Sequence, residues 1–209
     1  DFSNNITETK TPYAAESLNT SGGTFTTVVF NSTTQNLKWK AYAGNVSGAL
    51  VLDDGEDYSI YEWTLTALTG EVYASRASSI TWSGITCADS TDISTEEIAM
   101  NHTSSSVDSI VNTFNNDVHQ EFYVGTVNVA QSTCNTTYTW VNDSAQSESL
   151  TNPFQEMLLH DGTNMVYSTF INDDVQGFDF NDYDFQMILP EKGVGGYTAT
   201  RYYFYLELQ

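Results

Sequence analysis

The sequence predicts an all-β protein, an immunoglobulin-like or jelly-roll type β-sandwich of about 10–13 strands, with one or two short helices and an extended N-terminal arm. Three observations predict this fold. Apolar and polar residues alternate with a period of two along most of the chain, clusters of turn-forming residues separate the alternating segments, and only one segment has helical spacing. With 40% hydrophobic and 13% aromatic residues, the 209-residue chain has enough apolar surface to bury a core.

Residues 1–23 are predicted to form the arm, and residues 24–209 a single β-sandwich domain. The arm has little apolar periodicity beyond Phe2, Ile6 and Tyr13, and it ends in a Ser/Gly-rich stretch. Because such a segment has too little apolar surface to fold by itself, we expect it to be held by a neighbouring molecule, with packing along its own domain as the alternative. One physical solution is donation of the arm as an extra strand at a sheet edge. The candidate residues for strand donation are Phe2, Ile6, Phe25 and Phe30.

Alternation is clearest in residues 37–41, 61–65 and 79–83, where aromatic or aliphatic side chains alternate with polar ones. Further strands are predicted at residues 24–30, 48–53, 70–76, 118–124, 126–131, 136–141, 154–160, 164–171, 183–189 and 197–208. Turn clusters such as Asp161-Gly162 separate them.

The last predicted strand is apolar on both faces. Tyr202, Phe204, Leu206 and Leu208 would face a core, while Tyr203 and Tyr205 point the other way. Such a strand needs covering on both sides. It is therefore interpreted as a central strand of the sandwich, with pairing across a subunit boundary as the alternative.

One segment has helical spacing, with Val107, Ile110, Val111 and Phe114 at i, i+3, i+4 and i+7. Ser94 and Glu97 have the spacing of a capping box just before it. We expect one or two short helices between residues 94 and 115, with Glu96 and Glu97 as acids of a first helical turn, where the helix dipole favours them.

The charge balance limits the partners. Six basic residues against 27 acidic ones give a net charge of −21, too negative for nucleic acid or an anionic membrane surface. No stretch is long and apolar enough for a membrane span, and the chain beginning at Asp1 is interpreted as a secreted product after signal-peptide removal. Cys87 and Cys134 would fit one disulfide that closes a loop of about 47 residues, with two buried free thiols as the alternative.

Seven Asn-x-Ser/Thr sequons support an extracellular glycoprotein, because several lie in Gly/Ser/Thr-rich stretches typical of exposed turns. The alternative is turn asparagines that happen to stand before abundant Ser and Thr. The candidate sites of N-linked glycans are Asn5, Asn19, Asn31, Asn45, Asn101, Asn135 and Asn142.

Catalytic signatures are missing from the sequence: it contains no G-x-S-x-G, H-E-x-x-H or C-x-x-C motif. His102, His119 and His160 are interpreted as surface or strand residues, too far apart in sequence to imply a shared metal. Glu156 lies in a predicted strand, where an outward-facing carboxylate is expected. With 27 acidic residues, a carboxylate pair carries no weight as a glycosidase signal, so the chain is predicted not to be an enzyme.

A calcium site is considered at the densest acidic segment, which includes Asp179, Asn181, Asp182 and Asp184. Hard cations need six to eight oxygen ligands, and this spacing offers several from one turn. The segment lacks the glycine and the final glutamate of an EF-hand loop, so the alternative is a polar turn between two aromatic-rich strands. Residues 53–57 form a second, weaker candidate, and no other cofactor is expected.

Three segments, residues 39–48, 70–75 and 178–187, resemble segments of secreted archaeal surface glycoproteins of poorly defined function. The resemblance runs from about residue 36 to the C-terminus and implies no catalytic residue. The general plan is also similar to that of archaeal filament subunits that polymerise by strand donation and carry N-glycans. The chain differs from type IV pilins and archaellins because it has no N-terminal hydrophobic helix.

These observations predict a structural subunit of a glycosylated, pilus-like extracellular filament or surface layer, with copies of itself as partners in a head-to-tail homopolymer. The alternative is a carbohydrate-binding or adhesive cell-surface domain that uses surface Tyr and Trp, with calcium as a stabilising ion and surface glycans as partners. A secreted hydrolase is a third hypothesis.

Overall fold

The computed structural model describes residues 19–20, 23–24, 27–47, 49–53, 59–64, 69–193 and 200–208. These residues form mostly β-sheet with two short helices, so the all-β prediction is confirmed. The helices are α1 (Ser90–Ala99), α2 (Ile110–Thr113) and the 3₁₀ helix η1 (Trp82–Gly84). The strands are β1 (Asn19–Thr20), β2 (Gly23–Thr24), β3 (Thr27–Gln35), β4 (Trp39–Ser47), β5 (Ala49–Asp53), β6 (Ser59–Thr64), β7 (Thr69–Ser75), β8 (Thr86–Cys87), β9 (Phe122–Val124), β10 (Val127–Val129), β11 (Thr136–Tyr138), β12 (Gln155–His160), β13 (Met165–Asn172), β14 (Val175–Gln176), β15 (Asp182–Tyr183), β16 (Phe185–Pro190) and β17 (Tyr203–Leu208).

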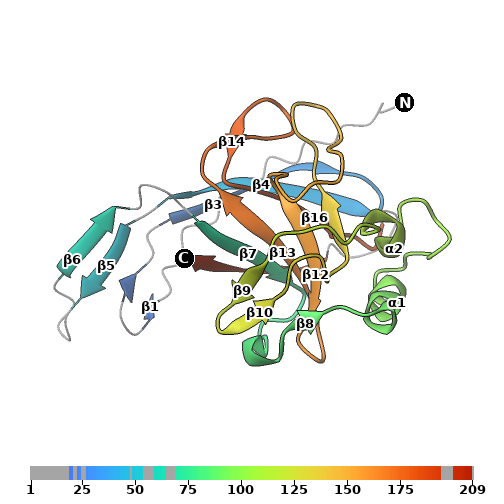
Figure 1. Ribbon diagram of the computed structural model, residues 1–209, viewed down its shortest axis with the longest axis horizontal. Helices are drawn as coiled ribbons and strands as arrows, with labels where there is room; N and C mark the ends of the chain where they lie inside the picture. Colours follow the sequence, from blue (N-terminus) through green and yellow to red (C-terminus); the bar gives the residue numbers. More distant parts are fainter. Residues whose placement is uncertain are drawn as a thin grey trace.

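A six-stranded antiparallel sheet is the centre of the molecule (Figure 1). Its strands follow the order β11-β12-β13-β7-β17, and β8 pairs with β12 beside this path. Strands β16, β4 and β3 form a second sheet, and β1, β2, β5 and β6 form a third that extends to the left in Figure 1. Two hairpins, β9-β10 and β14-β15, complete the described strands, and both α-helices lie at the end of the body opposite β5 and β6 (Figure 1).

The first hydrophobic core lies between the six-stranded sheet and the sheet of β16, β4 and β3. Successive side chains of a strand point to opposite faces, so alternate residues of β7, β13 and β16 meet in this layer. Helical residues close one end of the layer. Its buried members include Val72, Ala74, Leu158, Tyr167, Ile171, Phe185, Met187, Leu189, Ile93, Ile110 and Phe114.

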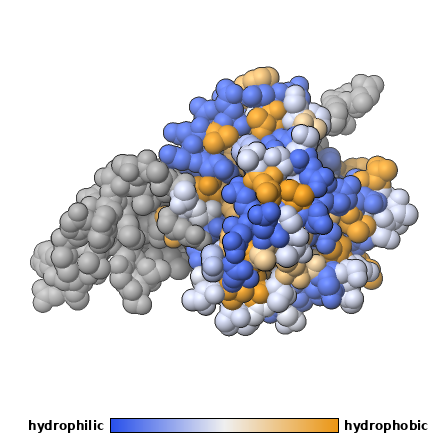
Figure 2. All heavy atoms as spheres, in the orientation of Figure 1, coloured by the Kyte–Doolittle hydropathy of each residue, from blue (hydrophilic) through white to orange (hydrophobic). Residues whose placement is uncertain are grey.

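The second core lies on the other face of the six-stranded sheet. Tyr73, Met157, Leu159 and Val166 are covered there by residues of the β9-β10 hairpin, by Ile85 and by Cys134. The central sheet is therefore buried on both faces, which explains why β7 and β12 are buried nearly continuously rather than at alternate positions. On the surface, the face drawn in Figure 2 carries small hydrophobic patches separated by hydrophilic residues.

The described chain contains seventeen strands, of which five span only two residues, so the twelve longer ones match the expected number. The predicted hairpin at Asp161-Gly162 is confirmed, because His160 in β12 pairs with Met165 in β13. The sheets are open and several are small. The immunoglobulin-like or jelly-roll type therefore stays a prediction, as does the division at residue 23, although β1 and β2 within residues 19–24 pair with each other and β2 pairs with β5.

The helices are where they were expected, but their details differ. Helix α1 is capped by Asp89, whose carboxylate accepts the N–H groups of Thr91 and Asp92 while the Asp92 carboxylate accepts the Asp89 N–H. The predicted Ser94–Glu97 capping box is wrong, because the Asp89–Asp92 pair has the same spacing and stands where the chain leaves β8. These N–H groups lower the pKa of Asp89.

The second helix, α2, is a single turn. Ile110 and Phe114 are buried in the first core, as their spacing predicted, whereas Val107 and Val111 are exposed. Residues 79–83, predicted as a strand, contain η1 instead. The Asp161 carboxylate accepts the Thr81 N–H at 3.0 Å and fixes this turn, and Trp82 packs edge-on against Tyr205 and beside Tyr73.

Candidate functional site

Strand β17 is the candidate assembly edge. It pairs antiparallel with β7, from Tyr203 opposite Ser75 to Leu208 opposite Gly70. The predicted two-sided pattern is confirmed, because Phe204, Leu206 and Leu208 pack against the first core and Tyr205 packs against the second. All six residues of the strand are half-buried.

The prediction of a central strand is not what the described residues show. β17 is the last strand on the path β11-β12-β13-β7-β17, and β7 is its one partner among the described strands. An edge strand presents a row of N–H and C=O groups that can pair with another chain. β17 therefore combines two apolar faces with an edge position.

Strands β7 and β17 approach each other closely where Gly70 faces the backbone of Glu207. A Cβ atom on Gly70, whose φ is +141°, would lie 2.1 Å from the carbonyl oxygen of Glu207. Only glycine fits there. The Glu207 side chain is also fixed, because its two carboxylate oxygens accept the Tyr73 hydroxyl and the Gly125 N–H, each at 2.8 Å.

Of the candidate donor residues, Phe2, Ile6 and Phe25 lie outside the described residues. Phe30 is in β3, opposite Gly44 of β4, and so belongs to the chain's own three-stranded sheet.

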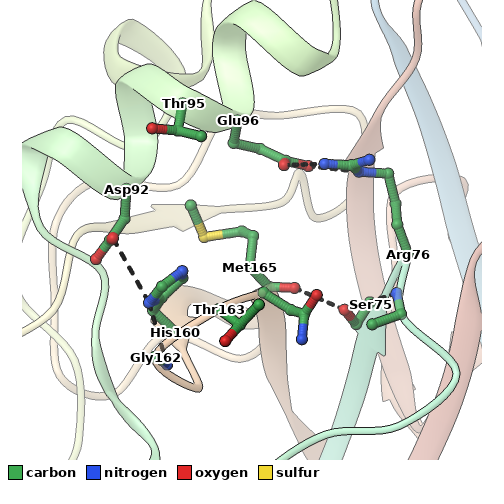
Figure 3. A pocket seen from close by; sticks show the side chains of 11 residues that line it. Ser75, Arg76, Asp92, Thr95, Glu96, His160, Gly162, Thr163 and Met165 are labelled. Atoms are coloured by element: carbon green, nitrogen blue, oxygen red, sulfur yellow. Dashed lines mark hydrogen bonds and ion pairs between the residues drawn. The ribbon is translucent and has the colours of Figure 1, made fainter.

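A polar hollow lies between β7, α1 and the β12-β13 hairpin (Figure 3). It has a volume of about 340 Å³. Its wall includes Arg76, Asp92, Glu96, His160 and Thr163, and Met165 lies across its floor in the view of Figure 3.

An ion pair joins two walls of this hollow. The Nε of Arg76 donates to Glu96 Oε1 at 2.9 Å, and a second, shorter contact joins Arg76 Nη2 to Glu96 Oε2, so the pair is bidentate. The Glu96 side chain is 5% exposed, and the Tyr167 hydroxyl lies 3.4 Å from its Oε1. Glu97 is buried as well and accepts the Val111 N–H. The prediction that Glu96 and Glu97 stand in a first helical turn is wrong, because α1 begins at Ser90.

His160 forms the second pair of the hollow, with its Nδ1 atom 3.5 Å from Asp92 Oδ1 and 3.2 Å from the Gly162 nitrogen. No Ser or Thr hydroxyl of the described residues hydrogen-bonds to this ring. The arrangement connects α1 to the β12-β13 hairpin.

The other two histidines are buried, which corrects their interpretation as surface residues. The His119 ring donates from Nδ1 to the Gln120 carbonyl, while Nε2 accepts the N–H groups of Thr133 and Cys134 at 3.0 and 2.9 Å. His102 packs edge-on against Trp39. Burial lowers the pKa of both imidazoles, so they are neutral in the folded protein.

Glu156 is the largest departure from expectation. It was predicted to face outward, but it is fully buried in the first layer, where its Oε2 accepts the Ile188 N–H at 2.8 Å. Among the described residues, its Oε1 has no hydrogen-bond partner, and neither has the hydroxyl of Thr169, directly opposite on β13. Burial raises the pKa of Glu156 well above its usual value and so favours the protonated, neutral form of the side chain.

Glu156→Gln is expected to raise the stability near pH 8 and to leave it unchanged below pH 4.5. Because the folded pKa is raised, the wild type is fully stable below the unfolded pKa and loses about 1.4 kcal/mol per pH unit between the two pKa values. Glutamine keeps the shape and never ionises. Urea unfolding across this pH range measures the effect, with the exposed Glu121→Gln as the matched control. Equal slopes for wild type and Glu156→Gln would contradict the neutral, buried acid.

Two of the calcium candidates, Asp184 and Asp179, serve as hydrogen-bond acceptors within the fold. Asp184 is buried, and its two oxygens accept the N–H groups of Val46 and Asp174. Asp179 accepts from Asn181 and from the Tyr183 hydroxyl, which lowers its pKa, although partial burial acts in the opposite direction. Across the described part of the chain, no three or more His, Cys, Asp or Glu side chains are grouped to hold a metal ion. Calcium stays a prediction, and residues 54–57 lie outside the described residues.

The predicted disulfide is present and joins Cys87 of β8 to Cys134. Among the sequons, Asn45 and Asn101 are exposed, whereas Asn135 and Asn142 are half-buried. Asn19 and Asn31 lie in β1 and β3, and Asn5 falls outside the described residues.

Comparisons of the chain with protein-family models, with curated proteins and with solved structures gave no match. The resemblance to archaeal surface glycoproteins therefore stays a prediction. None of the helices in the described ranges has the length and apolar character needed to cross a membrane.

Proposed function

We propose that the chain is a structural subunit of a glycosylated extracellular filament or surface layer, assembled by donation of a terminal β-strand to the next copy. The observation that carries the proposal is β17, an edge strand in the described sheet with apolar side chains on both faces. Soluble proteins usually protect such edges with lysine, proline or a bulge. The sequence of β17, YFYLEL, contains neither lysine nor proline, and its one charged residue, Glu207, is turned toward Tyr73 and Gly125.

The donor segment in this proposal is the first part of the predicted arm, residues 1–18, of a second copy. Phe2 and Ile6 are four residues apart, so they share one face of an extended strand and can enter pockets beside β17 while the backbone supplies ladder hydrogen bonds. Because donor and acceptor are different surfaces, the contact is heterologous, and repetition without closure gives a filament.

An extracellular location agrees with the Cys87–Cys134 disulfide, since disulfides persist in oxidising compartments. The seven sequons and the low number of basic residues point the same way.

The double variant Phe2→Asp/Ile6→Asp is expected to remain monomeric where the wild type forms fibres. Burial of each apolar side chain contributes about 1.5–3 kcal/mol, so the loss of both weakens the contact at least about a hundredfold. The matched control is Ser3→Asp/Thr9→Asp, which adds the same charge to the opposite face of the arm and leaves the Asn5 sequon intact. Light scattering after size exclusion and negative-stain electron microscopy are the measurements. A monodisperse wild-type monomer, or fibres of the Phe2→Asp/Ile6→Asp variant at wild-type concentrations, would contradict the proposal.

A carbohydrate-binding role is the second candidate, favoured by exposed aromatic rings. Trp140 is 52% exposed and Phe180 is 63% exposed. Flat rings of this kind stack on sugars. A glycan array, read with and without chelator for the wild type, Trp140→Ala and Phe180→Ala, tests this role, and loss of binding in either variant would support it.

A further inference from the structure

A second polar hollow surrounds one of the sequons. Asn135 lines a cavity of about 500 Å³, together with Asn115, Asn116, Asp117, Thr133, Cys134 and Glu148. This volume is within the range of small-molecule sites. We propose that Asn135 carries an N-linked glycan and that the sugar attached to it is seated in this hollow. The proposal does not depend on the assembly proposed above.

The hydrogen bond of the Asn135 side chain is compatible with this modification. Its Nδ2 donates one hydrogen to the Phe114 carbonyl at 2.9 Å. An amide nitrogen of asparagine carries two hydrogens, so the second can be replaced by a sugar while the first keeps its bond. The Phe114 carbonyl therefore fixes the plane of the amide.

The walls of the hollow are held in place by backbone hydrogen bonds. Asn116 and Thr136 exchange N–H and C=O bonds at 2.7 and 3.2 Å, which fixes residues 115–117 beside the sequon. On the other side, the Asn135 carbonyl accepts the Leu158 N–H at 2.9 Å. Asn135 lies between Cys134 of the disulfide and strand β11, and the other two residues of the sequon, Thr136 and Thr137, belong to that strand.

The chemistry of the walls fits a neutral, hydroxyl-rich ligand. Asp117 and Glu148 offer carboxylate oxygens that accept hydroxyl hydrogens, and the amides of Asn115 and Asn116 both donate and accept. None of the described residues that line the hollow is basic, and Asp117 and Glu148 would repel an anionic sugar. A sugar linked to Asn135 has an effective concentration in the millimolar range or higher, so weak individual hydrogen bonds suffice to seat it.

The linkage requires an external transferase and a sugar donor activated as a lipid-linked diphosphate. The Asn135 Nδ2 atom forms a bond to the anomeric carbon, the bond from that carbon to the diphosphate oxygen breaks, and the amide proton leaves as the diphosphate departs. The step involves no change of oxidation state.

Mass spectrometry of glycopeptides and hydrogen exchange test the proposal on the full chain produced in a host with N-glycosylation. We expect a glycan on Asn135 in the wild type and in Thr137→Ser, and none in Thr137→Ala, which keeps the asparagine but removes the sequon. Amide exchange at residues 115–117 should be slower by at least about tenfold in the glycosylated wild type than in Thr137→Ala. The same two proteins from a host without N-glycosylation should not differ in this exchange, which separates the effect of the sugar from that of the substitution.

Thr103→Ala is the matched control, because it removes the exposed Asn101 sequon and should leave exchange at residues 115–117 unchanged. An unmodified Asn135 in a preparation whose Asn101 or Asn45 carries glycans would overturn the proposal. Occupied Asn135 with unchanged exchange at residues 115–117 would overturn the seating of the sugar.

Discussion

The double variant Cys87→Ala/Cys134→Ala is expected to lose about 4 kcal/mol of unfolding free energy. The disulfide joins residues 47 positions apart, and a cross-link of this length removes that much conformational freedom from the unfolded chain. For a protein of this size the melting temperature should fall by roughly 10 °C. The disulfide also holds Cys134 and its neighbours over the second core, so the loss should appear first in the β9-β10 hairpin.

Thermal unfolding with and without a reducing agent measures this effect. The reducing agent should lower the melting temperature of the wild type and leave that of the double variant unchanged, which makes the variant its own control for side effects of the reagent. A double variant within about 1 kcal/mol of the wild type would show that the second core holds together without the cross-link.

Arg76→Ala is expected to cost about 3 kcal/mol. The substitution leaves the Glu96 carboxylate buried without its bidentate partner, and an uncompensated buried charge is among the most destabilising changes in a protein. We place the effect at the lower end of the usual range because the Arg76 side chain is 36% exposed and water can reach the carboxylate.

Arg201→Ala is the matched control, since Arg201 is the chain's other arginine and is exposed. It should change the stability by less than about 0.5 kcal/mol. The double variant Arg76→Ala/Glu96→Gln should recover part of the loss, because glutamine removes the unpaired charge. Equal stabilities for Arg76→Ala and Arg201→Ala, measured by urea unfolding, would contradict a structural role of the ion pair.

Most strands could be predicted from the sequence because local alternation decides them. The two-sided pattern of residues 202–208 correctly assigned Phe204 and Tyr205 to opposite faces. The disulfide could also be predicted from the sequence. A chain with extracellular features and two cysteines has one possible intramolecular disulfide, Cys87–Cys134.

The buried polar groups could not be predicted because their partners are distant in sequence. Glu156 meets the Ile188 N–H, 32 residues away, and Arg76 meets Glu96 across two different elements. A glutamate in a strand gives the same local sequence pattern whether its side chain faces water or a second sheet. Glu156 is buried because the sheet of β16, β4 and β3 covers this face of the central sheet. Local periodicity does not encode which face of a sheet is covered.

The pKa values of the buried acid and of the buried imidazoles are shifted in opposite directions. These shifts determine how the stability of the protein responds to acid. His102 and His119 have lowered pKa values, so they make folding less favourable as the pH falls below about 6.5. Glu156 has a raised pKa, so it makes folding more favourable as the pH falls toward about 4.5. Between about pH 6.5 and 4.5 the histidines and Glu156 change the free energy of folding in opposite directions. The stability therefore changes less on mild acidification than it would with either kind of group alone.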